Sequence, residues 1–148
     1  MKWKTLDFNA ETVQAIKKGE KVQTRRAFKI QPPKELPFRF LFDEKIANFA
    51  NDDALLSIFF PYGDINERLE IGDISIKIIN VRCERLNDIT PADCVCEGYV
   101  SDTSKHYAEE ELHALEWFRR TWESIYPNGY KSWDANPWVW VIEFEVSE

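Results

Sequence analysis

Three side chains of complementary chemical type stand out in the sequence: Lys21, Thr24 and Glu97. A hydroxyl such as that of Thr24 attacks an acyl carbon only when a base removes its proton. Lys21 can be that base only in its neutral form, which burial or neighbouring cations favour. Glu97 is expected at the end of a short helix, where the helix dipole disfavours a carboxylate and so suits a proton donor. The three residue types fit amide hydrolysis, although three ordinary surface side chains would give the same pattern.

The residues around Lys21 form a basic segment in an otherwise acidic chain. The whole chain has a net charge of −7, yet between Lys17 and Lys29 six basic residues accompany Glu20 as the one acidic residue. This segment predicts a site for one anionic or electron-rich ligand, rather than a groove that follows a long phosphate backbone. A solvated basic turn is the alternative interpretation.

The elements that must position these residues can be read from local signals. Asn9 is a suitable N-cap and Gly19 a suitable stop, so we expect a helix over residues 10–18 and an extended or turn-like segment over 21–28. Thr90-Pro91 begins a second helix, which should end at Gly98. Lys21 and Thr24 would point to opposite faces of a regular strand, so they converge only in a turn, a bulge or a helical geometry.

The remaining pattern predicts a single α+β domain over residues 1–148, built on a mostly antiparallel sheet or small barrel. In the last strand, over residues 138–146, the alternation of apolar and charged side chains predicts that both faces are covered at its start and that one face is in solvent at its end. The other expected elements are a short strand near 38–42, a buried strand over 55–60, a strand from 72 to 83 with a bulge near 78–80, a long amphipathic helix over 107–125 and the last strand over 138–146.

Composition limits the class of protein. The 148 residues are 44% hydrophobic, which is enough for a core without disulfides or metals. No apolar run approaches the roughly 18 residues of a membrane span, and the N-terminal residues lack the apolar stretch of a signal peptide. Three cysteines are a poor disulfide framework. We therefore expect a cytoplasmic protein with free thiols that does not engage a membrane.

Other residues are candidates for binding a ligand. Arg25, Arg26 and Lys29 could contact a nucleic acid or nucleoside, and Trp133 or Trp3 could stack on a base. Zinc ligation by Cys94 and Cys96 with His106 or His113 is not expected, because side chains at i and i+2 of a helix diverge and no second cysteine pair exists. No metal and no cofactor is expected.

Residues 19–26, Gly-Glu-Lys-Val-Gln-Thr-Arg-Arg, resemble the GxKxxTxR signature of the ASCH domain family, small proteins with a PUA-like β-barrel and flanking helices. The chain also resembles the phage and prophage branch often labelled morphogenetic protein. Only Ile71-Gly72-Asp73-Ile74 remains of the strand motif that usually follows Pro-Tyr-Gly in that branch. The segments that carry this second likeness are Lys29–Pro33, Pro61–Gly63, Glu84–Leu86, Ala92 to Glu97-Gly98 and Trp133–Trp140.

The resemblance implies roles for individual residues. In the bacterial acetylcytidine amidohydrolases of this superfamily, the signature lysine is the proton acceptor, the signature threonine the nucleophile and a glutamate the proton donor. By motif these roles fall on Lys21, Thr24 and Glu97. The family also includes members thought only to bind RNA. The leading expectation is thus a protein that binds a nucleoside or an RNA base, with removal of an acyl group from a modified cytidine as its enzymatic version. The alternatives are a non-catalytic RNA-binding module and a phage assembly protein.

Overall fold

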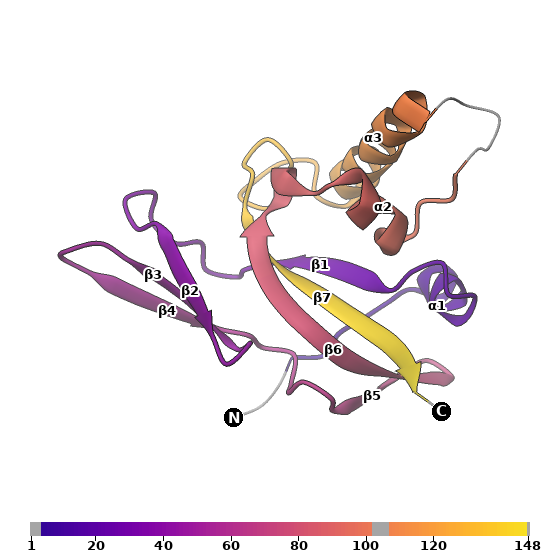
Figure 1. The fold of residues 1–148 in the computed structure, drawn as a ribbon, viewed down its shortest axis with the longest axis horizontal. Coiled ribbons are helices and arrows are strands. Elements are labelled where there is room, and N and C mark those ends of the chain that lie inside the picture. The colour runs from indigo at the N-terminus through magenta and orange to yellow at the C-terminus, as the bar shows by residue number, and fades with distance from the viewer. Residues whose placement is uncertain (1–3, 102–106, 148) are drawn as a thin grey trace.

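The computed structural model describes residues 4–101 and 107–147 (Figure 1). Helices and antiparallel strands are mixed along this part of the chain, so the predicted α+β class is confirmed. The elements are α1 (Ala10–Lys17), β1 (Gln23–Ala27), β2 (Phe38–Phe42), β3 (Ile46–Ala50), β4 (Leu55–Phe59), β5 (Arg68–Ile71), β6 (Ile74–Arg85), a 3-10 turn (Leu86–Asp88), α2 (Pro91–Glu97), α3 (Tyr107–Ile125) and β7 (Trp138–Ser147).

The strands form two sheets that share one apolar core. One sheet has the order β1-β7-β6-β5 and the other the order β2-β3-β4, and every pairing is antiparallel. Side chains from both sheets pack into the same cluster, among them Phe49, Ile76 and Trp140. The long strand β6 curves strongly, and α2 and α3 lie together near the end of it (Figure 1). The arrangement is that of a small β-structure with flanking helices.

The two short helices begin and end where their capping residues predict. Asn9 Oδ1 accepts a hydrogen bond from the backbone N–H of Thr12 at 2.8 Å, which caps α1. Thr90 and Asp93 form a reciprocal capping box at the start of α2. Gly19 and Gly98 follow the helices with φ of 75° and 122°, a backbone region that favours glycine.

The predicted bulge in β6 is confirmed, and it decides which side chains face α2. The register of β6 against β7 shifts between Ile78 and Asn80. Before the shift Ile76 and Ile78 point into the main core, and after it Val81 does so. Because the side-chain parity changes by one residue, Arg82 and Glu84 are turned away from the main core.

Strand β7 separates two apolar clusters, which explains its sequence pattern. Trp140, Ile142 and Phe144 belong to the core between the sheets, whereas Val139 and Val141 pack with residues of α2 and α3. The strand therefore starts covered on both faces and becomes exposed toward its end, as predicted.

One expectation about the strands is wrong, and two strands were not anticipated. The apolar run at 55–60 forms β4, but Leu55 and Phe59 are exposed, so the strand is not buried. Only its other face, with Leu56 and Ile58, packs against the core. Strands β3 and β5 were not anticipated, because β3 lies in a segment without a clean hydrophobic period and β5 has only four residues. No helix in the described ranges is long and apolar enough to cross a bilayer.

Candidate functional site

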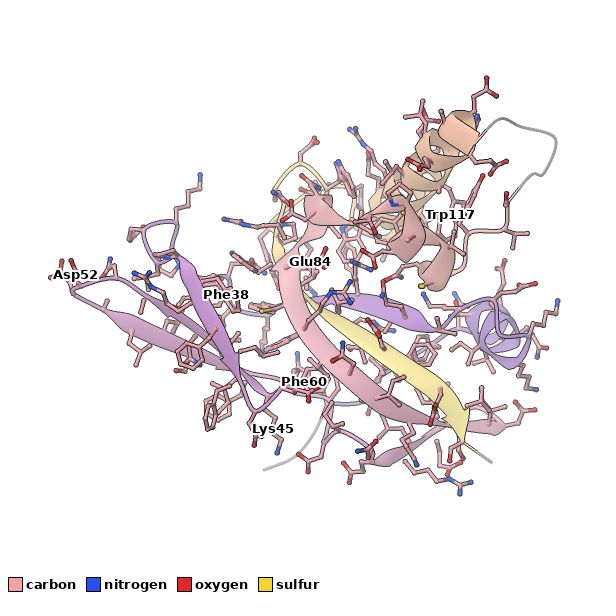
Figure 2. All side chains as sticks on the ribbon, in the orientation of Figure 1. Phe38, Lys45, Asp52, Phe60, Glu84 and Trp117 are labelled. Carbon is pink, nitrogen blue, oxygen red and sulfur yellow. The ribbon has the colours of Figure 1, made fainter. Side chains whose placement is uncertain are left out.

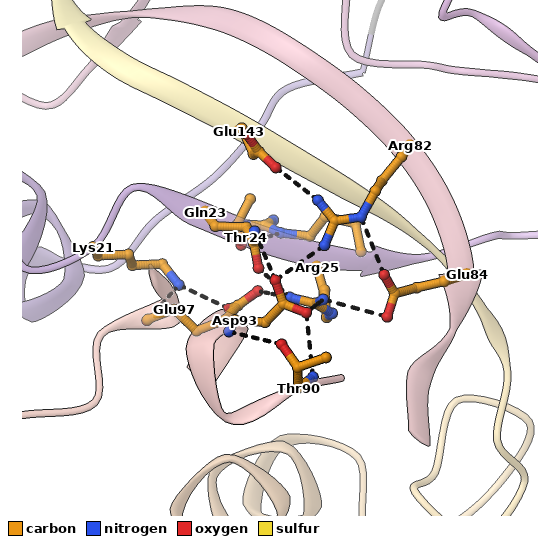
Figure 3. A network of polar contacts seen from close by, with 11 residues as sticks. Lys21, Gln23, Thr24, Arg25, Arg82, Glu84, Thr90, Asp93, Glu97 and Glu143 are labelled. Atoms are coloured by element: carbon orange, nitrogen blue, oxygen red, sulfur yellow. Dashed lines mark hydrogen bonds and ion pairs between the residues drawn. The ribbon is translucent and has the colours of Figure 1, made fainter. Parts of the chain in front are cut away.

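The face of the first sheet that lies against α2 carries charged side chains. Arg25 on β1 is paired with Val141 on β7, and Val141 with Arg82 on β6, so the three residues form a row across the sheet. We call the seven ionisable residues gathered here the charged cluster: Lys21, Arg25, Arg82, Glu84, Asp93, Glu97 and Glu143 (Figure 3).

Arg25 is at the centre of the charged cluster, and its side chain has no exposed surface. Its Nη1 lies 2.9 Å from Glu97 Oε2, and Nη1 also donates to Gln23 Oε1. Its Nη2 lies 3.2 Å from Asp93 Oδ2 and 3.4 Å from Glu84 Oε2. A buried cation is tolerated only with close anionic partners, so these carboxylates and Arg25 depend on one another.

A second guanidinium, that of Arg82, closes the charged cluster on the side away from Lys21. It lies 2.6 Å from Glu143, 3.1 Å from Asp93 and 3.2 Å from Glu84. Burial opposes the charged form of Arg82, but Asp93 and Glu84 raise its pKa above the ordinary value. Burial likewise acts to raise the pKa of Asp93, yet hydrogen bonds from Thr90, with the two arginines, bring it below the ordinary value.

Lys21 and Glu97 meet although 76 residues separate them. Lys21 Nζ donates to the backbone carbonyl of Glu97 at 2.9 Å and to its Oε1 at 3.1 Å. The backbone N–H of Val22 donates to the carbonyl of Cys96 at 2.8 Å, which anchors the segment before β1 to the end of α2. The structure thus brings Lys21, the predicted proton acceptor, and Glu97, the predicted proton donor, together as an ion pair.

Thr24 lies on the opposite face of β1 from Arg25. It is buried, stands opposite Ile142 in the register, and its Oγ1 accepts a hydrogen bond from Arg26 Nε at 3.4 Å. Among the described residues no hydrogen bond joins Lys21 Nζ to Thr24 Oγ1. Lys21 lies before Gln23, the first residue of β1, so one regular strand does not place both side chains.

Lys21, Thr24 and Glu97 nevertheless line the same cavity, which has a volume of about 720 Å³. Strand β1 is an edge strand of its sheet, so both of its faces can border one hollow. The cavity is also lined by residues of α1, α2 and α3. Its aromatic lining consists of Phe8, Trp117, Phe118, Trp122 and Tyr126.

Arg26 connects the polar and aromatic parts of the cavity. Its guanidinium carbon lies 4.9 Å from the centroid of the Phe8 ring, and its Nη2 donates to the backbone carbonyl of Asp7 at 2.7 Å. On the other wall, Trp122 Nε1 donates to the carbonyl of Lys131 at 2.7 Å, which fixes the orientation of that ring. The cavity therefore combines oriented ring surfaces with hydrogen-bonding groups.

The other predicted ligand-binding residues do not gather at this cavity in the same way. The Arg25 guanidinium is occupied by protein carboxylates. Lys29 is exposed and is not among the cavity-lining residues. Trp133 is half-buried and packs against Phe118, with ring centroids 6.3 Å apart. Trp3 lies outside the described residues.

Half of the six cations in the basic segment are paired with carboxylates of the protein itself. Lys17 Nζ lies 2.6 Å from Asp73 Oδ2, and Lys21 and Arg25 are paired with carboxylates of the charged cluster. Lys18 borders the cavity without an ion-pair partner in the described part of the chain. The segment is thus not a continuous cationic surface.

Sequence reasoning missed much of the charged cluster and one wall of the cavity. Arg82, Asp93, Glu143 and Trp117 were not singled out. For Asp93 a signal existed, because an acidic residue three positions after Thr90 is a capping-box pattern. Arg82 and Glu143 reach the charged cluster because of the register of β6 against β7, and local sequence patterns do not determine that register.

Residues of the kind that bind metals do not converge in the described ranges: no group of three His, Cys, Asp or Glu is placed to hold an ion. All three cysteines are free. Burial raises the pKa of the Cys94 thiol to about 12, which disfavours the thiolate that a metal would bind. His106 lies outside the described residues.

The ion pair between Lys21 and Glu97 has a chemical consequence. A neutral amine and a carboxylic acid hold the same total number of protons as an ammonium and a carboxylate. One proton transfer between Lys21 Nζ and Glu97 Oε1, which are 3.1 Å apart, would therefore produce both a base and an acid. No proton has to come from solvent.

Comparisons with known proteins gave one match. No family model matches the chain, and no curated protein matches it. A solved structure, the crystal structure of an ASCH domain from Lactobacillus crispatus JV V101, aligns with a TM-score of 0.44 and 14% sequence identity. The alignment covers 98% of this chain and 79% of that one.

Proposed function

We propose that the cavity binds a nucleoside or an exposed base of single-stranded RNA, and that residues 1–148 form one ASCH-type, PUA-like domain built around it. One observation carries the proposal: aromatic rings and hydrogen-bonding side chains line a single cavity of about 720 Å³. Small-molecule sites have volumes of about 300–1,000 Å³ and combine apolar walls with a few polar groups. A nucleoside needs both kinds of contact.

The lining supplies each contact that a base requires. Trp117 or Phe8 offers a ring for stacking, which is worth about 1–3 kcal/mol per base. Lys21 and Arg26 can donate hydrogen bonds to a base edge, and the Thr24 hydroxyl can donate or accept. Together these groups favour a flat heterocycle over a purely apolar ligand.

The charge distribution supports a single-residue site over a long nucleic-acid track. Lys17, Lys21 and Arg25 are each paired with protein carboxylates. Of the basic segment only Lys18, Arg26 and Lys29 are left to displace counterions from a polyanion, so we expect a shallow salt dependence, with a slope corresponding to at most about three phosphates.

A second candidate function is removal of an acyl group from a modified cytidine, favoured by the presence of Lys21, Thr24 and Glu97 in one cavity. Thr24 Oγ would form a bond to the acyl carbon while Lys21 Nζ takes the hydroxyl proton. The C–N bond would then break as Glu97 protonates the leaving amine, and water would hydrolyse the Thr24 ester and restore the hydroxyl. Since Lys21 contacts Glu97 and not Thr24, ligand binding must first release Lys21 from that ion pair.

Because Lys21 contacts Glu97 and not Thr24, the geometry favours binding without a covalent step, and we place the non-catalytic binding module ahead of the hydrolytic function. An assembly role in phage development rests on the family resemblance alone and would require a protein partner.

Titration calorimetry and acetate release together test the proposal. Cytidine, acetylcytidine and a short single-stranded RNA should bind the wild-type protein, and Trp117→Ala should weaken binding about tenfold or more because a stacking surface is lost. Lys29→Met, which removes a cation outside the cavity, is the matched control and should leave affinity nearly unchanged. If none of the three ligands binds, the proposal fails. If acetylcytidine binds but wild-type protein releases no acetate, and Thr24→Val binds equally well, the hydrolytic candidate alone is removed.

A further inference from the structure

Trp117 on α3 borders both the cavity and a second, smaller hollow. This hollow has a volume of about 200 Å³, and we call it the side pocket. The side chains that line it are Tyr99, His113, Glu116, Trp117, Arg120 and Thr121. Trp117 and Thr121 also line the cavity of about 720 Å³, so the two hollows meet at the same two side chains. Trp117 lies where α3 approaches the end of α2 (Figure 2).

The Trp117 ring is close to the polar side chains of the cavity. A Cβ atom placed on Gly98 would lie 3.8 Å from Lys21 Cβ and 3.8 Å from Trp117 Cη2. Lys21 and the edge of the Trp117 ring therefore border the same glycine. A base that accepts a hydrogen bond from Lys21 is thus within reach of the Trp117 ring.

Among the described residues, no aromatic ring stacks in parallel on Trp117. The Tyr99 ring centroid is 5.8 Å away with an interplanar angle of 54°, and the Phe118 centroid is 6.4 Å away with an angle of 57°. The Trp117 side chain is also only half-buried. An indole without a parallel neighbour can accept a flat base on its ring. Proteins that bind single strands use such rings to hold successive bases.

Arg120 supplies the side pocket with a cation that the protein holds weakly. Its side chain is 79% exposed, and the partner that it has in the described ranges is Glu116, at 3.4 Å and one helical turn away. An exposed pair of this kind contributes little to stability, because water solvates both groups. A phosphate can therefore replace Glu116 at the Arg120 guanidinium, which suits the two oxygens that a phosphate presents.

We infer that the ligand of the cavity is a single strand of RNA, and that the side pocket takes the nucleotide next to the bound base. The inference rests on the proposed function. One base lies against Trp117 in the cavity, the adjoining phosphodiester contacts Arg120, and the neighbouring base lies in the side pocket. A volume of about 200 Å³ is below the about 300–1,000 Å³ of a complete small-molecule site, so the side pocket suits one part of a larger ligand.

Titration calorimetry with cytidine and with the dinucleotide cytidylyl-cytidine tests this inference. The wild-type protein should bind the dinucleotide about tenfold more tightly than cytidine, because a stacking contact and a phosphate contact are added. Arg120→Gln should remove most of this advantage and leave the affinity for cytidine unchanged. Arg119→Gln is the matched control and should change neither affinity. Arg119 is also exposed on α3, but it pairs with Glu123 and is not a lining residue of either hollow.

Glu116→Gln should have the opposite effect on the dinucleotide. Because Glu116 competes with a phosphate for Arg120, its neutralisation should raise the affinity for the dinucleotide several-fold. The affinity for cytidine should stay the same, since cytidine has no phosphate. A pair that only stabilised α3 would not produce this gain.

Two results would overturn the inference and leave the proposed function standing. One is a dinucleotide that binds no more tightly than cytidine, and the other is an Arg120→Gln variant that weakens both ligands equally or neither. If neither ligand binds the wild-type protein at millimolar concentration, the proposed function fails and the inference fails with it. Circular dichroism should show an unchanged fold in all three variants, because the substituted side chains are exposed.

Discussion

Two surfaces of this molecule reverse the usual distribution of side chains. Against α2, the first sheet buries the charged cluster, with Arg25 wholly enclosed by Glu84, Asp93 and Glu97. On the second sheet, the face turned away from the core leaves Phe40, Phe42 and Phe59 half exposed. In the first region charge lies where apolar packing would be more stable, and in the second apolar surface lies in solvent.

The difference teaches what each region is suited to do. The charged cluster holds Lys21 and Glu97 in fixed positions at the cavity, because Arg25 engages the free oxygen of the Glu97 carboxylate. The exposed phenylalanines of the second sheet do not line the cavity. Substitutions in the charged cluster should thus affect folding and the cavity, whereas substitutions of the exposed phenylalanines should affect neither.

The largest loss in the free energy of unfolding is expected from Arg25→Met. This substitution removes the central cation and leaves three carboxylates close together. Breaking a buried ion pair by removing one partner costs about 3–5 kcal/mol, so the free energy of unfolding in urea should fall by about this amount. Arg120→Met is the matched control, because Arg120 pairs with Glu116 on the exposed surface of α3. A loss as small for Arg25→Met as for the control would contradict the role given to the charged cluster.

A smaller loss in the free energy of unfolding is expected from Asp93→Asn, and this loss depends on pH. Because the folded pKa of Asp93 lies below its ordinary value of 3.8, its carboxylate stabilises the fold above that value, and the stabilisation is lost as pH falls through the folded pKa. Urea unfolding should show the variant less stable than wild type at about pH 6, with the difference shrinking toward about pH 3. A difference that stays constant across this range would show that charge is not what Asp93 contributes.

The smallest effect on folding is expected from Phe42→Ser. Its side chain is exposed, so the free energy of unfolding in urea should change by about 0.5 kcal/mol or less. A loss above about 2 kcal/mol would mean that the ring packs within its own chain, and the contrast between the two surfaces would disappear.

Local signals in the sequence predicted much of the fold. The caps at Asn9 and Thr90, the period of the helix over 107–125 and the phase slip near 78–80 each involve residues close in sequence. All four appear in the structure. The run at 55–60 was misjudged, because an apolar run does not reveal whether one or both faces are covered.

The candidate site was less accessible to sequence reasoning. The contact of Lys21 with Glu97 spans 76 residues, and its expectation came from the family resemblance and not from spacing. Arg82 and Arg25 face the same carboxylates only because β7 aligns both with Val141. Such alignments depend on the register of three strands, which local patterns leave open.

The central claim is that a flat heterocycle binds in the cavity, and indole signals in a ¹H–¹⁵N NMR titration test it most directly. The chain has six tryptophans, of which Trp117 and Trp122 line the cavity, whereas Trp133 and Trp138 are not among its lining residues. Added cytidine or acetylcytidine should shift the Trp117 and Trp122 signals in a saturable manner and leave the Trp133 and Trp138 signals in place. Saturable shifts confined to Trp133 or Trp138, or no shift at all at millimolar nucleoside, would contradict the claim.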